Sequence, residues 1–139
     1  MTDYLTTKER SKLMSRVGQK NTKPELVVRK FLYALGYRYR LHRRDLPGSP
    51  DIVFAGRRRV IFVHGCFWHQ HPECKRAARP KTRKSFWSRK LDRNVERDRE
   101  MIEQLKSLSW NVLVVWECQT RDTAVLEKTL VDFLGPKLR

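Results

Sequence analysis

The chain of 139 residues is short of acidic side chains: 15 Asp and Glu stand against 31 Lys and Arg, and the net charge is +16. It also lacks any apolar run near the roughly 20 residues of a membrane-spanning helix, which argues against a membrane protein. Residues 1–4 lack the basic-then-apolar pattern of a secretion signal, so we expect a cytoplasmic location. The three cysteines are too few to pair completely, and a reducing compartment disfavours disulfides.

What the chain does contain is enough apolar sequence, 40% of all residues, for a core. Its length predicts one domain spanning residues 1–139. So large a positive charge on a foldable chain indicates a polyanionic partner, with DNA or RNA as the first candidate and a membrane surface as the second.

Periodicity predicts a mixed α/β fold. The capping box Thr22–Glu25 opens a helix that runs to Leu35 and ends at Gly36. A long helix is predicted over about 85–108, and a last one from Asp122 to Leu134. Predicted strands cover 37–41, 51–54, 59–63 and 110–116, with a hairpin turn at 56–57 and a fourth strand apolar enough to be central. Residues 1–21 form an arm that either lies on DNA or is a solvated terminus, with a short helix opening at about Thr6.

The segment 64–74 concentrates three histidines and two cysteines directly after a buried strand. Soft and borderline ligands of this kind favour tetrahedral zinc, with Cys118 as a distant fourth ligand. The set is Cys66, His71, Cys74 and Cys118, although the spacing also allows His69 in place of His71. Four protein ligands would make the site structural. The alternative is three ordinary buried cysteines.

A nuclease needs a carboxylate to hold a hard cation and a base for the attacking water. Asp51, after a Ser-Pro turn, is the best ligand candidate, and the hairpin should place it near Val63, whose carbonyl is the available second ligand. His69 is a natural base. Asp98 and Glu25 stand on apolar helix faces and are candidates to orient the base or metal-bound water; alternatively Glu25 only caps its helix and Asp51 only caps its turn.

Phe67 and Trp68 are large rings in a predicted loop, and Trp87 lies among basic residues. Apolar wedges of this type can enter a base stack, most easily where pairing is weak. The alternative is that these rings cover the zinc site or the core.

Together these residues resemble the very-short-patch repair endonuclease family, Vsr. The resemblance extends from about Met14 to Thr120. It is carried by Asn21–Glu25, Gly48–Phe54, His64–His69, Asn94–Arg99 and Val114–Cys118. It implies a restriction-endonuclease-like fold, a central mixed sheet flanked by helices, with a structural zinc site. The implied activity is a Mg²⁺-dependent nick in double-stranded DNA, 5′ to the thymine of a T:G mismatch left by deamination of 5-methylcytosine.

The resemblance also implies roles for individual residues. Asp51 and the Val63 carbonyl would bind Mg²⁺, and His69 would be the general base. Asp98 and Glu25 would support His69 or the hydrated metal, and His64 would be a further active-site residue. The zinc ligands would be Cys66, His71, Cys74 and Cys118. DNA would be contacted by Phe67, Trp68 and Trp87 from the major groove, by Met14 from the minor groove, and by Lys90 and Asn94.

Two positions depart from the family pattern: two residues instead of one separate His71 from Cys74, and Val63 replaces a threonine. A backbone carbonyl tolerates the second change. We expect a nucleoid-associated monomer that can contact other mismatch-repair proteins. The competing hypotheses are a nuclease indifferent to mismatches and a zinc-stabilised DNA-binding module without turnover.

Overall fold

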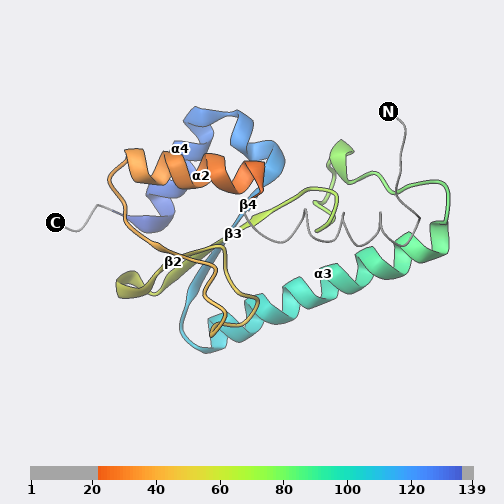
Figure 1. Cartoon of the computed structure of the whole chain (residues 1–139), viewed down its shortest axis with the longest axis horizontal. Coiled ribbons are helices and arrows are strands. Elements are labelled where there is room, and N and C mark those ends of the chain that lie inside the picture. Colours follow the sequence, from red (N-terminus) through yellow and green to blue (C-terminus); the bar gives the residue numbers. More distant parts are fainter. Residues whose placement is uncertain (1–21, 136–139) are drawn as a thin grey trace, which may run out of the picture.

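The computed structural model describes residues 22–135 (Figure 1). Within them the helices are α2 (Lys23–Ala34), α3 (Lys84–Ser107) and α4 (Thr123–Leu134). The strands are β1 (Arg40–Leu41), β2 (Ile52–Phe54), β3 (Arg59–His64) and β4 (Asn111–Trp116), and short 3-10 helices occupy Ala55–Arg57, Lys75–Ala77 and Glu117–Arg121. No helix in this part of the chain is long and apolar enough to cross a membrane.

The strands form one mixed sheet in the order β1-β2-β3-β4. β2 is antiparallel to both β1 and β3, and a hairpin through Ala55–Arg57 joins it to β3, with Arg58 in the left-handed region (φ 52°). β3 and β4 are parallel, and α3 is the crossover between them. The sequence prediction of a mixed sheet with helices is confirmed.

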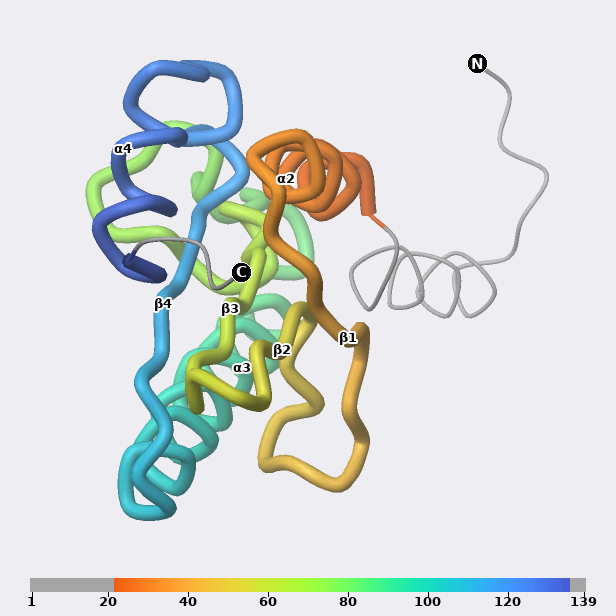
Figure 2. Tube along the Cα trace, turned by 90° about the vertical axis from the view of Figure 1, so that its left-hand side faces the viewer, coloured from red at the N-terminus to blue at the C-terminus, as the bar shows by residue number. Residues whose placement is uncertain are grey.

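Helices cover both faces of this sheet. α2 and α4 lie on one face and α3 on the other (Figures 1 and 2). Along β3, Ile61 and Val63 belong to the core cluster formed with α2 and α4, whereas Val60 and Phe62 belong to the cluster formed with α3. Burial on both faces explains why β3 reads as a continuous apolar run.

The ends of α2 follow from local sequence. Thr22 Oγ1 accepts a hydrogen bond from the Glu25 backbone N–H, and Gly36 adopts φ 96° just past the helix. The amides of Gly36 and Tyr37 return to the carbonyls of Tyr33 and Leu32, both at 3.0 Å, which is the Schellman arrangement. The Thr22 N-cap therefore places Glu25 in the first turn of α2, beside the ends of the strands.

Three predictions need correction. Only Arg40–Leu41 of the predicted strand 37–41 pair, because Tyr37 turns into the core and its hydroxyl donates to the Gly135 carbonyl at 2.6 Å. β4 is an edge strand rather than a central one; α3 and α4 cover its faces, so its composition resembles that of a central strand. Helical spacing puts Val95 on the apolar stripe of the helix predicted over 85–108, but Val95 is 41% exposed and lies off the buried face of α3.

Candidate active site and metal cluster

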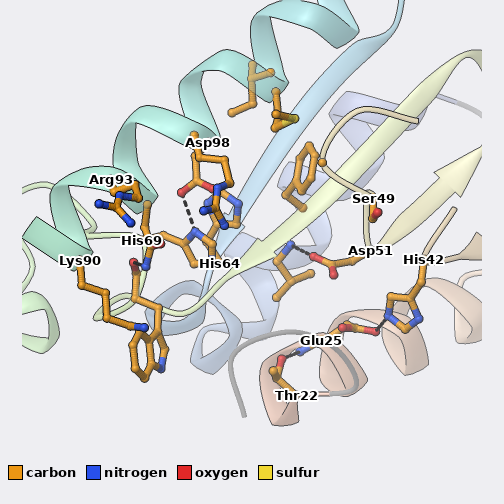
Figure 3. Close-up of a pocket in the computed structure, with 18 of the residues that line it drawn as sticks. Thr22, Glu25, His42, Ser49, Asp51, His64, His69, Lys90, Arg93 and Asp98 are labelled. Atoms are coloured by element: carbon orange, nitrogen blue, oxygen red, sulfur yellow. Dashed lines mark hydrogen bonds and ion pairs between the residues drawn. The ribbon is translucent and has the colours of Figure 1, made fainter. Parts of the chain in front are cut away.

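A cleft of about 910 Å³ opens beside the start of β2 and the end of β3. The first turn of α2, the loop before β2, the loop after β3 and one side of α3 form its walls (Figure 3). The structure brings nine of the residues singled out from the sequence to this cleft: Glu25, Asp51, Val63, His64, Trp68, His69, Lys90, Asn94 and Asp98.

Asp51 is buried directly before β2. Its Oδ2 accepts a hydrogen bond from the Val63 backbone N–H at 2.7 Å, so the predicted proximity of these two residues is confirmed. Because the N–H and C=O of one strand residue point to the same side, the Val63 carbonyl also faces the Asp51 side of β3. Burial raises the pKa of Asp51 to about 7, with the Val63 N–H opposing the rise and Glu25 adding to it.

Glu25 does more than begin a helix. Its carboxylate is 1% exposed; Oε2 accepts a hydrogen bond from Arg29 at 3.2 Å and lies 2.7 Å from His42 Nε2. Sequence reasoning missed His42. The available signal was its position: it follows β1 directly, where the register Leu41↔Ile52 places it beside Asp51.

His69 and Asp98 come from the loop after β3 and from the middle of α3. Their Nδ1 and Oδ2 atoms lie 2.6 Å apart, and both side chains are about one-fifth exposed (Figure 3). The His69 ring stacks on His64 with centroids 3.8 Å apart. Burial, followed by the proximity of His69, holds the pKa of His64 well below its usual range, so His64 is a neutral support.

The oxygens beside Asp51 suit a hard cation. Possible ligand atoms of Glu25, His42 and Asp51 all lie within 4.8 Å of one another. Carboxylate and carbonyl oxygens are the ligands that Mg²⁺ prefers, and Mg²⁺ commonly keeps several waters beside one or two carboxylates. Asp51 and the Val63 carbonyl therefore fit Mg²⁺ in donor type.

The cysteines gather as the sequence predicts. One ligand atom from each of Cys66, His71, Cys74 and Cys118 lies within 4.8 Å of the other three. His71 Nδ1 is 3.7 Å from the Cys66 sulfur and 3.5 Å from the Cys118 sulfur. Ligands at the usual zinc distances on a tetrahedron are about 3.6 Å apart, so this donor set fits zinc.

Of the two candidate histidines, His71 lies in this cluster and His69 in the cleft. Burial raises the pKa of Cys66 to about 12, so its thiolate form requires a nearby positive charge. The backbone N–H of Arg76 lowers the pKa of Cys74. The cluster joins the loop after β3 to the chain after β4, and the His71 ring stacks on Trp116 at 4.3 Å.

Phe67, Trp68 and Trp87 form an aromatic cluster beside the cleft. Their ring centroids lie 5.2 to 5.9 Å apart, and all three are half-buried. They belong to neither core cluster, and the ring over the cysteine cluster is Trp116. The alternative role as core or metal-site cover is therefore not supported for these rings. Phe86 extends the cluster, with its ring centroid 5.3 Å from that of Trp87.

One side of α3 presents cations to the cleft. Arg89, Arg93 and Arg97 line it, and none forms an ion pair within residues 22–135. Lys90 Nζ lies 5.9 Å from the Trp68 ring centroid, and Asn94 donates to the Trp68 carbonyl at 3.3 Å. Asn94 thus also ties the loop after β3 to α3. Met14 lies outside the described residues.

Comparison with known proteins adds independent findings. Residues 2–76 match the family model for DNA mismatch endonuclease Vsr. The type II nicking enzyme V.XorIIP of Xanthomonas oryzae pv. oryzae is 49% identical over 98% of this chain and 99% of its own length. The type II nicking enzyme V.NmeAIP of Neisseria meningitidis is 42% identical over 94% and 92% of the two chains. The DNA mismatch endonuclease Vsr of Escherichia coli is 43% identical over 87% of this chain and 77% of its own length.

Proposed function

The chain belongs to the DNA mismatch endonuclease Vsr family, and from this premise we propose that it makes a Mg²⁺-dependent nick 5′ to the thymine of a T:G mismatch in double-stranded DNA. The family makes it an endonuclease. The observation that carries the finer proposal is one cleft that unites a buried carboxylate, a histidine–aspartate pair and a cluster of half-buried rings.

Asp51 and the Val63 carbonyl would hold Mg²⁺ at the floor of the cleft. When bound, Mg²⁺ neutralises charge on the scissile phosphate and stabilises the leaving oxygen. The Val63 N–H fixes the rotation of the Asp51 carboxylate through the 2.7 Å hydrogen bond. Glu25, 1% exposed and beside Asp51, is suited to accept hydrogen bonds from water bound there.

His69 is the proposed general base. With its Nδ1–H donating to Asp98, its Nε2 is left as the acceptor for a proton from the attacking water. Asp98 then stabilises the imidazolium that forms. His64, buried and neutral, supports the ring by stacking and adds no charge that would oppose protonation.

Zinc held by Cys66, His71, Cys74 and Cys118 would be structural. It would fix the loop that carries Phe67, Trp68 and His69 relative to the end of β4. Phe67, Trp68 and Trp87 would enter the base stack from the major groove beside the mismatch, where weak pairing lowers the cost of unstacking. Met14 would approach from the minor groove, and Lys90 and Asn94 would contact the DNA.

The mixed sheet covered by helices on both faces supports a restriction-endonuclease-like fold. We place the enzyme, as a single domain and a monomer, at the bacterial nucleoid, where other mismatch-repair proteins are available as partners.

The decisive experiment compares duplexes carrying T:G, C:G and T:A pairs in a panel of flanking sequences, with the cut position mapped. We expect one nick, 5′ to the mismatched thymine. Asp51→Ala should abolish it while retaining DNA affinity, and His69→Ala should lower its rate by about 10²–10⁴-fold. Equal cutting of C:G duplexes would favour a nuclease indifferent to mismatches. Tight binding without any nick in Mg²⁺ would favour a DNA-binding module.

A further inference from the structure

His42 connects two elements of the proposed active site. Its backbone N–H donates to the Asp51 carbonyl at 3.1 Å, and its side-chain Nε2 lies 2.7 Å from Glu25 Oε2. Its backbone is in the left-handed region (φ 48°), which is uncommon for a residue with a side chain. Such a conformation persists only where surrounding contacts hold it, and here it directs the imidazole from the end of β1 towards α2 (Figure 3).

The contact with His42 stabilises the buried carboxylate of Glu25. Glu25 is 1% exposed, and a buried carboxylate without hydrogen bonds is costly. Arg29 and His42 both contact Oε2, so the two contacts restrain the position of this carboxylate oxygen. Glu25 is also close to Asp51, because ligand atoms of the two carboxylates lie within 4.8 Å of each other.

We propose that His42 is a positioning residue, which donates Nε2–H to Glu25 and thereby holds its carboxylate beside Asp51 in the orientation that cation binding and cleavage require. This inference rests on the proposed function and assigns a residue to it. The 2.7 Å separation is that of a charge-assisted hydrogen bond, which supports positioning through Glu25 rather than direct binding of a cation by the imidazole.

The test compares His42→Leu, which removes the donor, with His42→Gln, whose amide N–H can occupy the place of Nε2–H. The matched control is Arg43→Gln: Arg43 is the next residue, but its guanidinium pairs with Asp45. Partners that orient metal-site groups are typically worth 10- to 100-fold in affinity or activity. We therefore expect His42→Leu to slow single-turnover nicking of a T:G duplex 10- to 100-fold at unchanged DNA affinity, with His42→Gln close to wild type.

A second readout is independent of turnover. Mn²⁺ titrated calorimetrically into the protein bound to an uncleavable phosphorothioate duplex should bind 10- to 100-fold more weakly to His42→Leu, but not to Arg43→Gln. In a double-mutant cycle, His42→Leu should add little to Glu25→Gln, because both changes disrupt the same contact. NMR of the wild-type protein should find the His42 proton on Nε2, which requires no variant to fold.

Three results would overturn the inference: a His42→Leu enzyme with wild-type rate and Mn²⁺ affinity, full additivity with Glu25→Gln, or nitrogen coupling from His42 in the Mn²⁺ resonance spectrum, which would make it a direct ligand. A wild-type enzyme that fails to nick T:G duplexes refutes the proposed function instead, so the two failures are distinguishable.

Discussion

The cations of α3 allow a quantitative prediction about DNA binding. Arg89, Arg93 and Arg97 recur every four residues on the side of the helix that lines the cleft. The helical rise separates the first from the last by about 12 Å, a length over which one DNA strand carries about three to four phosphates. We predict that these three side chains each neutralise a phosphate.

The structure supports this because the two acids that stand between these arginines in the sequence are engaged elsewhere. Asp92 pairs with Arg79 at 2.7 Å, and Glu96 with Arg99 at 2.5 Å. Each phosphate contact to B-DNA contributes about 0.9 to the slope of log affinity against log salt. Replacing all three arginines by glutamine should therefore reduce the slope by about 2.7, which corresponds to about 40-fold less loss of affinity between 50 and 200 mM salt.

The assay is fluorescence anisotropy of a labelled T:G duplex at four or more salt concentrations, without divalent cation so that no cleavage occurs. Arg99→Gln is the matched control, since it removes the same charge from the same helix at a side chain already paired with Glu96. We expect single variants to change the slope by about 0.9 and the control to change it far less. An unchanged slope in the triple variant, or an equal change in the control, would refute the phosphate contacts.

Two further predictions concern the metal cluster and Asp51. Cys118→Ser should lose bound zinc. Zinc binding contributes to the free energy of folding, and each kcal/mol lost lowers Tm by about 4 °C in a domain of this size, so we expect Tm to fall by about 10 °C or more. Unchanged zinc content would contradict the assignment of Cys118 as a ligand. Asp51, with its pKa raised to about 7, keeps its proton in the folded state while the unfolded chain releases it near pH 4. Without added Mg²⁺, this carboxyl should therefore lower the free energy of unfolding as pH rises from about 4 to 7, by at most about 1.4 kcal/mol per unit. Urea unfolding of wild type and Asp51→Asn should show the difference, and parallel pH curves would disprove it.

Much of the fold was predictable because local signals agree with the packing. The Thr22 cap and Gly36 terminator bound α2, and the apolar runs in β2 and β3 reflect burial on both faces. The strand order was harder to predict from the sequence. β4 is apolar because helices cover its faces, and not because it is a central strand. Local pattern reports burial of a strand's faces and does not report its hydrogen-bonding neighbours.

The candidate site was likewise predictable only in part, because some of its residues are distinguished by their neighbours in space and not by local sequence. Histidines and cysteines concentrated in residues 64–74 made that loop conspicuous, and spacing alone left His69 and His71 interchangeable. Only their three-dimensional neighbours, Asp98 for one and the cysteines for the other, separate them. His42 stands alone in a basic segment, and its relevance depends on the register of β1 with β2, which the sequence does not state.

Register links the fold to the site through Asp51. β2 and β3 bury apolar side chains on both faces, so a slip of one residue would exchange one apolar set for another and cost less than in a strand with a polar face. A buried carboxylate does discriminate between registers, because the pairing Ile52↔Ile61 lets Asp51 meet the Val63 N–H, and a shifted pairing would leave it without that partner. The residue proposed to hold the catalytic cation therefore also helps to select the strand pairing that positions it.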